Sequence, residues 1–431
     1  MQKFDYAIVG GGFTGFSAAY ELQKRGFSVL ILEKDAEVGG LASSFNFCGT
    51  KVDRFYHHWF TGDKHILDFI DELGLAHELN ISTSRTGVYY ANNFYKLCTV
   101  RDLLSFNALN FVDRIRLGLL TLRVRFVKNW KSLEKLTAKE WIINLAGVNV
   151  YKVLWEPLLK GKFGRYCDEI SAVWFWNKIK LRGGSRNAKG DECLIYLKGG
   201  FQRICDAIGE KLSSSGGCIV KNCEVTGLSK VNELTFIHTT NGDFKAEKVI
   251  LTTSLPVVSK IISNLVEPDF IQKLSKIKYI GNVCLVIALN KSLSDYYWLN
   301  VNDPNFPFVG IIEHTNFQFT SDYNGKHVVY VSKYLPTDDV LYTMPDKELL
   351  NYYVLNIKRI FPEFSIEQII DFKIWRERYS QPIIERDYSE IIPDYKLPID
   401  NVFLCTMAQI YPEDRGTNYA VREGRKIGRV V

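Results

Sequence analysis

Residues 7–45 read AIVGGGFTGFSAAYELQKRGFSVLILEKDAEVGGLASSF, and this stretch decides the fold. A short apolar run, 4–9, has the length and β-branched character of a buried strand, and it stops at three consecutive glycines. The next segment, 14–25, has a helical pattern, and Gly26 follows it as the expected left-handed residue after a helix. A second apolar run occupies 27–32. The order strand, glycine turn, helix, strand predicts a βαβ unit.

The glycines of this unit have the spacing Gly10-x-Gly12-x-x-Gly15, and an acid, Glu33, ends the second strand. The first glycine allows the tight turn, the second lets a pyrophosphate approach the backbone, and the third packs the helix against the strand. The N-terminus of the helix then faces the phosphates. A carboxylate at position 33 can accept hydrogen bonds from both hydroxyls of a ribose. The unit therefore predicts a dinucleotide-binding site.

Composition narrows the class of protein. The chain has 431 residues and is 46% hydrophobic, enough for two domains or for one large domain with an embedded lobe. Lys and Arg exceed Asp and Glu by 54 against 48, a mild excess that suits phosphorylated ligands or an anionic membrane surface and gives no reason to expect nucleic acid. No apolar run is long enough to span a bilayer, and we recognise no secretion signal. The nine cysteines are scattered without a CxxC pair, so we expect a cytoplasmic protein without a metal site.

Periodicity predicts the remaining elements. An amphipathic helix is expected at 64–73, and the region 103–155 is mostly helical in pattern. Strands are expected at 223–225, 234–238, 248–251, 283–289, 327–331 and 402–405, and a closing helix from about Thr417. Because neither an internal repeat nor a low-complexity linker occurs, we expect lobes that are interleaved in the sequence.

Several stretches together resemble one family. Residues 7–45 closely resemble the amino-terminal FAD motif of the superfamily of flavin amine oxidases, protoporphyrinogen oxidases and phytoene desaturases, which also includes UDP-galactopyranose mutase. The resemblance continues in LLKGKFGRYCDEISAVW (158–174), YLKGGFQRICDAI (196–208), CEVTGL (223–228), EKVILTTSLP (247–256) and NVFLCTMAQIYPEDRGTNYAVREGRKIGR (401–429). It implies an α/β fold, in which a Rossmann-like FAD-binding domain of the glutathione reductase type is interleaved with an α+β substrate domain.

The family's domain division and its cofactor contacts can be transferred to this chain. The FAD-binding domain would comprise residues 1–80, 196–260 and 395–431, and the substrate-binding domain 81–195 and 261–394. The glycine pair Gly39-Gly40 is the feature that favours FAD over NAD. The resemblance assigns Gly10, Gly12 and Gly15 to the pyrophosphate, Glu33 to the adenosine ribose, Gly39 and Gly40 to the phosphate and ribityl region, Val225 to adenine through its main chain, and the N–H groups of Asn418, Tyr419 and Ala420 to the pyrimidine end of the flavin.

The resemblance implies an FAD-dependent oxidoreductase that removes a hydride from a substrate C–H bond to flavin N5, as an oxidase or a desaturase does. Two departures bear on this expectation. Thr406-Met407 stand where the family usually has Gly followed by an acid, and no lysine falls within 279–289, the strand that commonly carries one in amine oxidases. The second departure argues against simple amine oxidation. The alternatives are a flavin-dependent nucleotide-sugar mutase and, less favoured because all three glycines are intact, a non-enzymatic prenyl-binding protein of the same fold.

Candidate substrate residues are arginines, whose forked donors suit phosphate and carboxylate groups. Arg182 precedes two glycines in what reads either as a loop that grips a diphosphate or as a solvated loop. Arg376 would hold an acidic substrate group or form a surface ion pair. The small-molecule substrate could be lipid-linked or a nucleotide-sugar. Basic residues in the leucine-rich segment 114–128 fit either a peripheral membrane contact or an ordinary solvated helix face.

The segment RFYHHWFTGD, residues 54–63, follows the glycine pair at the distance where family members run a strand past the flavin ring. Aligned in this way, His58 takes the position of the mutase histidine and is the candidate catalytic residue. We expect His57 on the opposite face of the strand, in a structural role.

Overall fold

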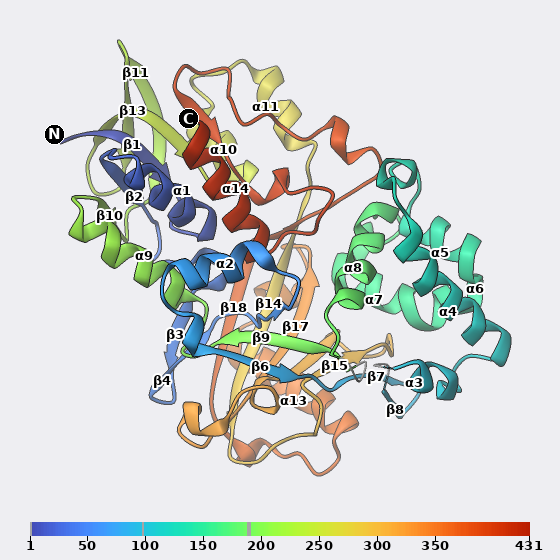
Figure 1. The fold of residues 1–431 in the computed structure, drawn as a ribbon. Coiled ribbons are helices and arrows are strands. Elements are labelled where there is room, and N and C mark those ends of the chain that lie inside the picture. The colour runs from blue at the N-terminus through green and yellow to red at the C-terminus, as the bar shows by residue number, and fades with distance from the viewer. Residues whose placement is uncertain (1, 97–98, 188–190) are drawn as a thin grey trace.

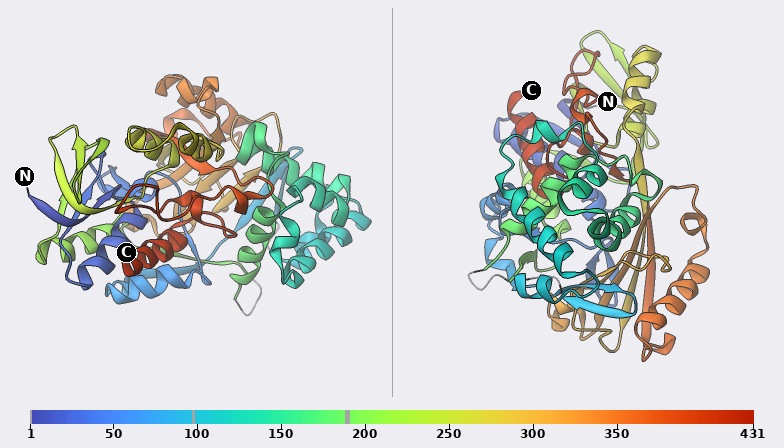
Figure 2. Two further views of the ribbon diagram at one scale, coloured as in Figure 1. Left: turned by 90° about the horizontal axis from the view of Figure 1, so that it is seen from above. Right: turned by 90° about the vertical axis from the view of Figure 1, so that its right-hand side faces the viewer.

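The computed structural model describes residues 2–96, 99–187 and 191–431. Two large sheets form the body of the molecule, and a group of helices projects from one side of it (Figure 1, Figure 2). No helix in the described residues is both long enough and apolar enough to cross a bilayer. The eight described cysteines are all free, whereas Cys98 lies outside the described residues.

The first sheet has the order β10-β2-β1-β13-β12-β11, and β19 pairs with the second half of β13. The strands from β10 to β13 run parallel, as does β19, whereas β13, β12 and β11 form an antiparallel meander. Their bounds are β1 (Lys3–Val9), β2 (Val29–Leu32), β10 (Cys218–Val220), β11 (Val225–Val231), β12 (Leu234–Thr239), β13 (Phe244–Leu251) and β19 (Val402–Leu404). The α/β fold and the βαβ unit are as predicted, but the strand expected at 223–225 begins only at Val225.

Helices α1 (Phe13–Lys24) and α14 (Thr417–Val430) pack closely together beside this sheet. A Cβ at Gly424 would lie 2.4 Å from the carbonyl oxygen of Thr14, and a Cβ at Gly428 would lie 2.6 Å from that of Ala18. The contacts advance by four residues along both helices, so the two helices run parallel. Their N-termini therefore point toward the same end of the sheet.

The second sheet has the order β18-β14-β17-β16-β15-β7-β8. Its bounds are β7 (Thr86–Tyr90), β8 (Asn93–Lys96), β14 (Tyr279–Leu289), β15 (Trp298–Val301), β16 (Gly310–Glu313), β17 (His327–Leu335) and β18 (Ile369–Pro382). Central strand β14 is buried on both faces, which explains its continuous apolar sequence. Leu285 and Ile287 pack with α13 (Asp346–Ile360), whereas Cys284 and Val286, which alternate with them, pack toward the first sheet.

The chain thus alternates between the two sheets, and each strand of these sheets lies within one of the two proposed domains. The proposed boundaries after residues 80 and 195, however, cut the strands Leu79–Thr83 and Cys193–Leu197 of a small third sheet. The helices that project from the body lie between β8 and β9 in the sequence. They are α3 (Val100–Ser105), α4 (Phe111–Phe126), α5 (Ala138–Ala146), α6 (Val148–Val150), α7 (Glu156–Phe163) and α8 (Ala172–Gly184). We call α3 to α8 the helical insertion.

The remaining elements are short. A small sheet, β5-β9-β6, joins the segment before α2 to the chain after the helical insertion. The bounds are β3 (Ser44–Phe47), β4 (Thr50–Asp53), β5 (Trp59–Phe60), β6 (Leu79–Thr83), β9 (Cys193–Leu197), α2 (Lys64–Glu72), α9 (Gln202–Ser214), α10 (Leu255–Ile262), α11 (Pro268–Ser275) and α12 (Val340–Thr343).

Candidate functional site

Glycine serves two different purposes in the turn between β1 and α1. Gly10 has a φ of +111°, and a Cβ at Gly15 would lie 2.1 Å from the carbonyl oxygen of Gly10, so the backbone of the turn itself requires both glycines. By contrast, a Cβ at Gly12 would meet no atom nearer than the Cα of Gly40, at 4.0 Å. The space in front of Gly12 is therefore open, and α1 begins there without a side-chain cap. The N–H groups of its first turn face that space.

Glu33 and the glycine pair Gly39-Gly40 are held against this turn by hydrogen bonds. The Oε2 of Glu33 accepts a hydrogen bond of 2.7 Å from the N–H of Gly11, and its Oε1 accepts one from the N–H of Asp35. Burial raises the pKa of Glu33 above its ordinary value, although these two donors oppose the shift. The N–H of Gly39 donates to the carbonyl oxygen of Gly11 over 2.7 Å, which brings Gly39 and Gly40 against the turn.

Two buried hydroxyl groups beside the glycines have no hydrogen-bond partner. They are Thr253 Oγ1 and Ser43 Oγ. A Cβ at Gly10 would lie 3.1 Å from the side chain of Thr253, and a Cβ at Gly39 would lie 3.0 Å from the Cα of Ser43. Open space at the second glycine, an uncapped helix N-terminus and unsatisfied hydroxyls fit a bound dinucleotide such as FAD.

The position of Glu33 indicates where the adenine end of a bound FAD would lie. The N–H of Cys223 donates to the carbonyl oxygen of Glu33 over 2.9 Å, so the start of β11 lies beside the carboxylate proposed for the ribose. Val225 is the first residue of β11, and a bulge separates its pairing from that of Gly227. This geometry fits the assignment of Val225 to adenine, which stays a proposal.

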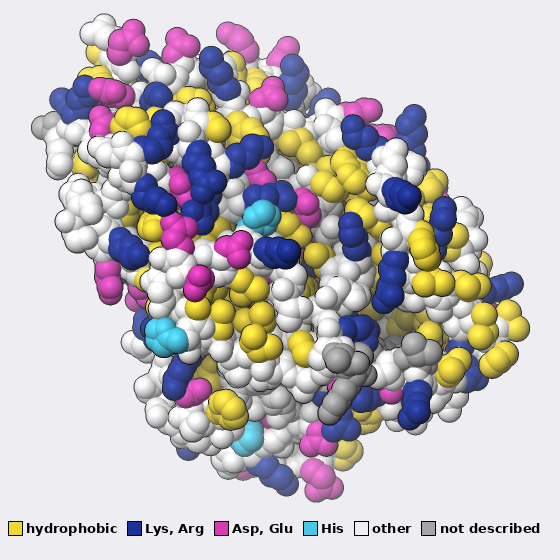
Figure 3. Space-filling view, in the orientation of Figure 1, with side chains coloured by type: hydrophobic (Ala, Val, Ile, Leu, Met, Phe, Trp, Pro, Cys, Tyr) yellow, Lys and Arg dark blue, Asp and Glu magenta, His cyan; other side chains and the backbone are white. Residues whose placement is uncertain are grey.

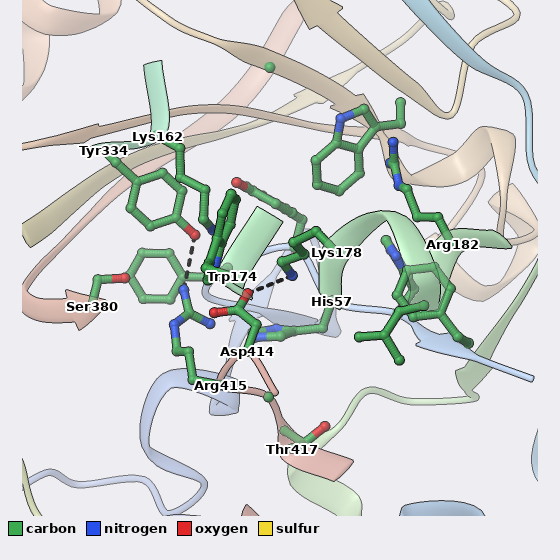
Figure 4. Close-up of a pocket in the computed structure, with 18 of the residues that line it drawn as sticks. His57, Lys162, Trp174, Lys178, Arg182, Tyr334, Ser380, Asp414, Arg415 and Thr417 are labelled. Carbon is green, nitrogen blue, oxygen red and sulfur yellow. Dashed lines mark hydrogen bonds and ion pairs between the residues drawn. The ribbon is translucent and has the colours of Figure 1, made fainter. Parts of the chain in front are cut away.

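A cavity of ≈ 350 Å³ lies between the two sheets and the helical insertion, and Figure 4 shows part of its lining. Four parts of the chain contribute to it: the segment 55–60, helices α7 and α8, the second sheet, and the residues 414–419 that lead into α14. Leu41, which follows the second glycine pair, also lines it. The cavity therefore reaches from the proposed FAD site to the helical insertion.

The N-terminus of α14 opens onto this cavity. Thr417, Asn418 and Tyr419 line it. The Oγ1 of Thr417 accepts a hydrogen bond of 2.8 Å from the indole of Trp59, and the Oδ1 of Asn418 accepts one of 3.0 Å from the N–H of Ile66. These bonds fix the helix end in place.

The assignment of the Ala420 N–H group to the flavin is not supported, because this group already has an acceptor. The N–H of Ala420 donates to the carbonyl oxygen of Gly416 over 2.9 Å, because Ala420 already belongs to the hydrogen-bonded ladder of α14. The N–H groups of the first helical turn, from Thr417 to Tyr419, are the ones without an intrahelical acceptor.

His57 and His58 both line the cavity. The prediction that they lie on opposite faces of a strand is wrong, because both residues precede β5 and form no strand. The Nδ1 of His58 lies 2.9 Å from the hydroxyl oxygen of Tyr297, whereas the buried Nδ1 of His57 has no partner. Burial lowers the pKa of His57 to about 4 and that of His58 to about 3. Both rings are therefore neutral near pH 7.

Cationic side chains dominate the charged part of the lining. They are Lys162, Lys178, Arg182 and Arg415, and the carboxylates that line the cavity with them are Asp63 and Asp414. The Nζ of Lys178 lies 2.6 Å from Asp414 (Figure 4). Burial alone would raise the pKa of Asp414, but Lys178, Lys162 and Arg415 together hold it well below its ordinary value.

Lys162 stands apart from that ion pair. Its Nζ lies 4.7 Å from the ring centre of Tyr334 and 5.5 Å from that of Trp174, and no salt bridge among the described residues involves it. Burial lowers the pKa of its amine. Arg415 donates to the hydroxyl oxygen of Tyr334 over 3.0 Å. Because no described carboxylate lies within salt-bridge distance of Lys162, its amine can pair with an anionic ligand.

The two arginines predicted for the substrate have different surroundings. Arg182 lines the cavity, but it belongs to the last turn of α8 and not to a loop; its Nε lies 3.8 Å from Glu192. Arg376 lies in β18, and its guanidinium donates to the carbonyl oxygens of Tyr342 and Met344 and pairs with Asp346. Because these groups already occupy its donors, we no longer assign Arg376 to the substrate.

Thr406, which with Met407 stands where the resemblance leads us to expect a glycine followed by an acid, caps a short 3₁₀ turn. Its Oγ1 accepts a hydrogen bond from the N–H of Ala408, and Gln409 returns one to the N–H of Thr406. Among the described residues, no group of three or more His, Cys, Asp or Glu side chains is placed to hold a metal ion.

The sequence alone does not single out Lys162, Lys178, Asp414 or Arg415 as lining residues of the cavity. Lys162 lies in LLKGKFGRYCDEISAVW (158–174), one of the stretches that resemble the family, and Asp414 precedes the closing helix. Because α7 and α8 carry other charged residues as well, the sequence of these helices gives no signal for the two lysines, and only the packing of α7 and α8 shows that their side chains reach the cavity.

Comparison with known proteins agrees with this geometry. The model of the family "flavin containing amine oxidoreductase" matches residues 13–427. The chain is 25% identical over 281 residues to "Probable flavin-containing monoamine oxidase A" of Dictyostelium discoideum, across 59% of this chain and 58% of that protein. It is 19% identical over 457 aligned residues to the zeta-carotene desaturase of Arabidopsis thaliana, across 94% and 80% of the two chains.

Among solved structures, an oxidoreductase from Methanosarcina mazei superimposes with a TM-score of 0.77 at 16% identity, covering 99% of this chain and 100% of that one. This likeness concerns the fold. The chain spans 58% of the length of the Dictyostelium relative and 80% of that of the desaturase.

Proposed function

The chain belongs to the flavin containing amine oxidoreductase family, and on that premise we propose that it is an FAD-dependent oxidoreductase that takes a hydride from a substrate C–H bond. The observation that carries the proposal is the cavity, which extends from Leu41, beside the second glycine pair, to the N-terminus of α14. Bound FAD would supply the hydride acceptor. Every other task falls to the chain's own residues.

Each part of the site would have a physical task. The open face of Gly12 and the first turn of α1 would hold the pyrophosphate, and Glu33 the ribose. Gly39 and Gly40 would line the phosphate and ribityl region. The free N–H groups from Thr417 to Tyr419 would face the negative charge that gathers at the pyrimidine end of a reduced flavin. The aromatic walls of the cavity would exclude water from the reacting carbon.

We propose further that the substrate carries an anionic group, a carboxylate or a phosphate, on a largely apolar body. The cationic lining and the position of Lys162 beside Tyr334 and Trp174 support this substrate class. An ammonium group would be repelled by Lys162 and Arg415 in a site of low dielectric. Arg182, at the end of α8, would meet the same anion or a second one.

His58 remains the proposed flavin-side residue, now with a narrower role. A histidine with a pKa of about 3 does not donate a proton as imidazolium near neutral pH. Its neutral ring, held by Tyr297, would orient a substrate or flavin group through Nε2. His57 is an equal candidate, because its buried Nδ1 lacks a partner.

The first test identifies the cofactor and the class of substrate that reduces it. Purified protein should release FAD on denaturation, and a colourless protein would contradict the proposal. Anaerobic mixing with protoporphyrinogen, which bears two carboxylates, with carotenoid precursors, and with putrescine should bleach the flavin fastest for an apolar compound bearing an anionic group. Bleaching by putrescine alone would disprove the substrate class and leave the oxidoreductase standing.

Lys162→Met should lower the bleaching rate constant for a carboxylate substrate by about tenfold to a hundredfold, since a charge-assisted contact is lost, while FAD content stays unchanged. The matched control is Lys160→Met, which removes an exposed lysine of the same helix that pairs with Glu156. If dithionite-reduced protein instead interconverts two UDP-hexoses without net oxidation, the mutase alternative replaces the redox reaction.

A further inference from the structure

Helix α4 carries two apolar faces. One is buried within the helical insertion and contains Leu117, Leu120 and Val124. The other is exposed along its whole length, and its side chains retain 43% to 64% of their accessible surface. This exposed face consists of Phe111, Val112, Ile115, Leu119, Leu122 and Phe126.

The exposed residues form one continuous stripe. Successive residues of an α-helix turn by about 100°, so these six side chains fall within an arc of about 100° on the side opposite the buried residues. Leu145 of α5 and Val148 of α6, which are also exposed, belong to helices that pack against α4. A patch of this kind is uncommon on a monomer and marks a surface that contacts something apolar.

Arginines border the stripe on both sides. By the same helical geometry, Arg116 and Arg123 lie along one edge and Arg114 and Arg125 along the other. Arg116 pairs with Asp113, and Arg114 donates to the carbonyl oxygens of Leu109 and Leu104. No salt bridge among the described residues involves Arg123 or Arg125. Figure 3 shows hydrophobic and basic side chains side by side over the part of the molecule that Figure 1 labels α4 to α6.

We propose that α4 lies in the surface of an anionic phospholipid bilayer. The apolar stripe would enter the boundary between headgroups and acyl chains, and Arg123 and Arg125, one on each edge, would reach back to the phosphates. Charge complementarity selects this partner over a second copy of the chain, because two such stripes would bring two sets of arginines together.

The helical insertion connects this face to the cavity. The indole of Trp176 in α8 donates a hydrogen bond of 3.0 Å to the carbonyl oxygen of Val124 in α4, and α8 also carries Lys178 and Arg182. The membrane contact does not depend on the proposed reaction, but it would hold the cavity close to substrates that dissolve in lipid.

Vesicle flotation tests the contact directly. Full-length holoprotein should float with vesicles of phosphatidylglycerol and phosphatidylcholine and bind vesicles of pure phosphatidylcholine at least about tenfold more weakly. Raising the salt concentration should weaken binding to the anionic vesicles several-fold, because it screens the arginines. Equal binding to both vesicle types, or binding to neither, would overturn the proposal.

The variant Leu119→Glu should reduce binding to anionic vesicles at least about tenfold, since a charge replaces an exposed leucine that would be buried in the bilayer. Its matched control is Leu355→Glu on α13, where the side chain is also exposed, at 67%, but lies outside the stripe. Both variants should keep the flavin content and thermal midpoint of the parent. If sedimentation without lipid shows that Leu119→Glu converts a dimer to a monomer, the stripe is an interface between copies and the membrane proposal is wrong.

Discussion

His314 shows at the residue scale how burial sets charge in this molecule. Its Nε2 lies 2.7 Å from the hydroxyl oxygen of Tyr323, and its buried Nδ1 has no partner. Burial lowers the pKa of His314 from 6.5 to about 3. Between these two values the unfolded chain binds a proton that the folded chain does not, so acid favours unfolding. The stability that the neutral ring provides is complete above pH 6.5 and is lost as the pH falls toward 3.

Replacing His314 by Gln should make the free energy of unfolding less sensitive to acid. Lowering the pH from 7 to 5 should reduce the parent's free energy of unfolding by about 2 kcal/mol through this one group. The pH then lies about 1.5 units below the unfolded-state pKa, and each unit corresponds to about 1.4 kcal/mol. Urea unfolding of both proteins at the two pH values measures the difference. The carboxyl groups of Asp53 and Glu313, whose pKa values burial raises to about 6 and about 7, act in the opposite sense, so only the difference between the two proteins is informative.

The control for this measurement is His77→Gln, which changes a histidine whose side chain is 75% exposed. It should leave the pH dependence as it is in the parent. If both variants changed the acid sensitivity equally, burial of His314 would not be the cause.

The sequence indicates which residues of the glycine turn lie together better than it indicates the lining of the cavity, for a physical reason. The contacts of Glu33 with Gly11 and of Gly39 with Gly11 join residues of one short stretch, so local spacing determines them. Lys162 and Tyr334 come from an inserted helix and a strand far away in the chain. No local pattern encodes such a contact, and the substrate side of the cavity had to be found from the packing.

At the element scale, the close packing of α1 and α14 positions both helix N-termini. Gly424 and Gly428 present no side chain to α1, which lets the backbones approach. The sequence indicated both helices but not their parallel contact. It likewise predicted helix over 103–155 without showing which apolar face of α4 is buried, because both faces repeat with helical spacing.

Gly424→Val should therefore displace α14 from α1. The new Cβ would lie 2.4 Å from the carbonyl oxygen of Thr14 and 2.9 Å from the Cβ of Ser17, so the helix must move. We expect a loss of about 3 kcal/mol in the free energy of unfolding. FAD affinity should fall at least about tenfold, because the first turn of α14 moves with its helix. Urea unfolding and flavin fluorescence titration measure the two effects.

The matched control is Gly118→Val, another glycine within a helix, where the added Cβ would meet only Leu103, at 3.6 Å. It should retain FAD affinity. An unchanged FAD affinity in Gly424→Val would show that the position of α14 does not matter for the cofactor.

At the scale of the whole molecule, the proposed FAD site combines distant parts of the chain. The glycine turn and Glu33 come from the start of the sequence, Val225 and Thr253 from its middle, and Thr417 from its end. The cofactor would thus be bound only when these parts are folded together. Global unfolding must release it, and binding must stabilise the entire fold.

Removing FAD should accordingly lower the thermal midpoint, and adding it back should restore it. At a free concentration a thousand times the dissociation constant, binding contributes about 4 kcal/mol, which for a chain of this length corresponds to roughly 4 °C. Scanning fluorimetry of the apoprotein over a titration of FAD measures the rise.

Gly12→Val should abolish the rise without lowering the midpoint of the apoprotein, because Gly12 has extended backbone angles and open space in front of it. The control Gly118→Val should show the same rise in thermal midpoint with FAD as the parent. If the rise also persisted in Gly12→Val, FAD would bind elsewhere than at the glycine turn.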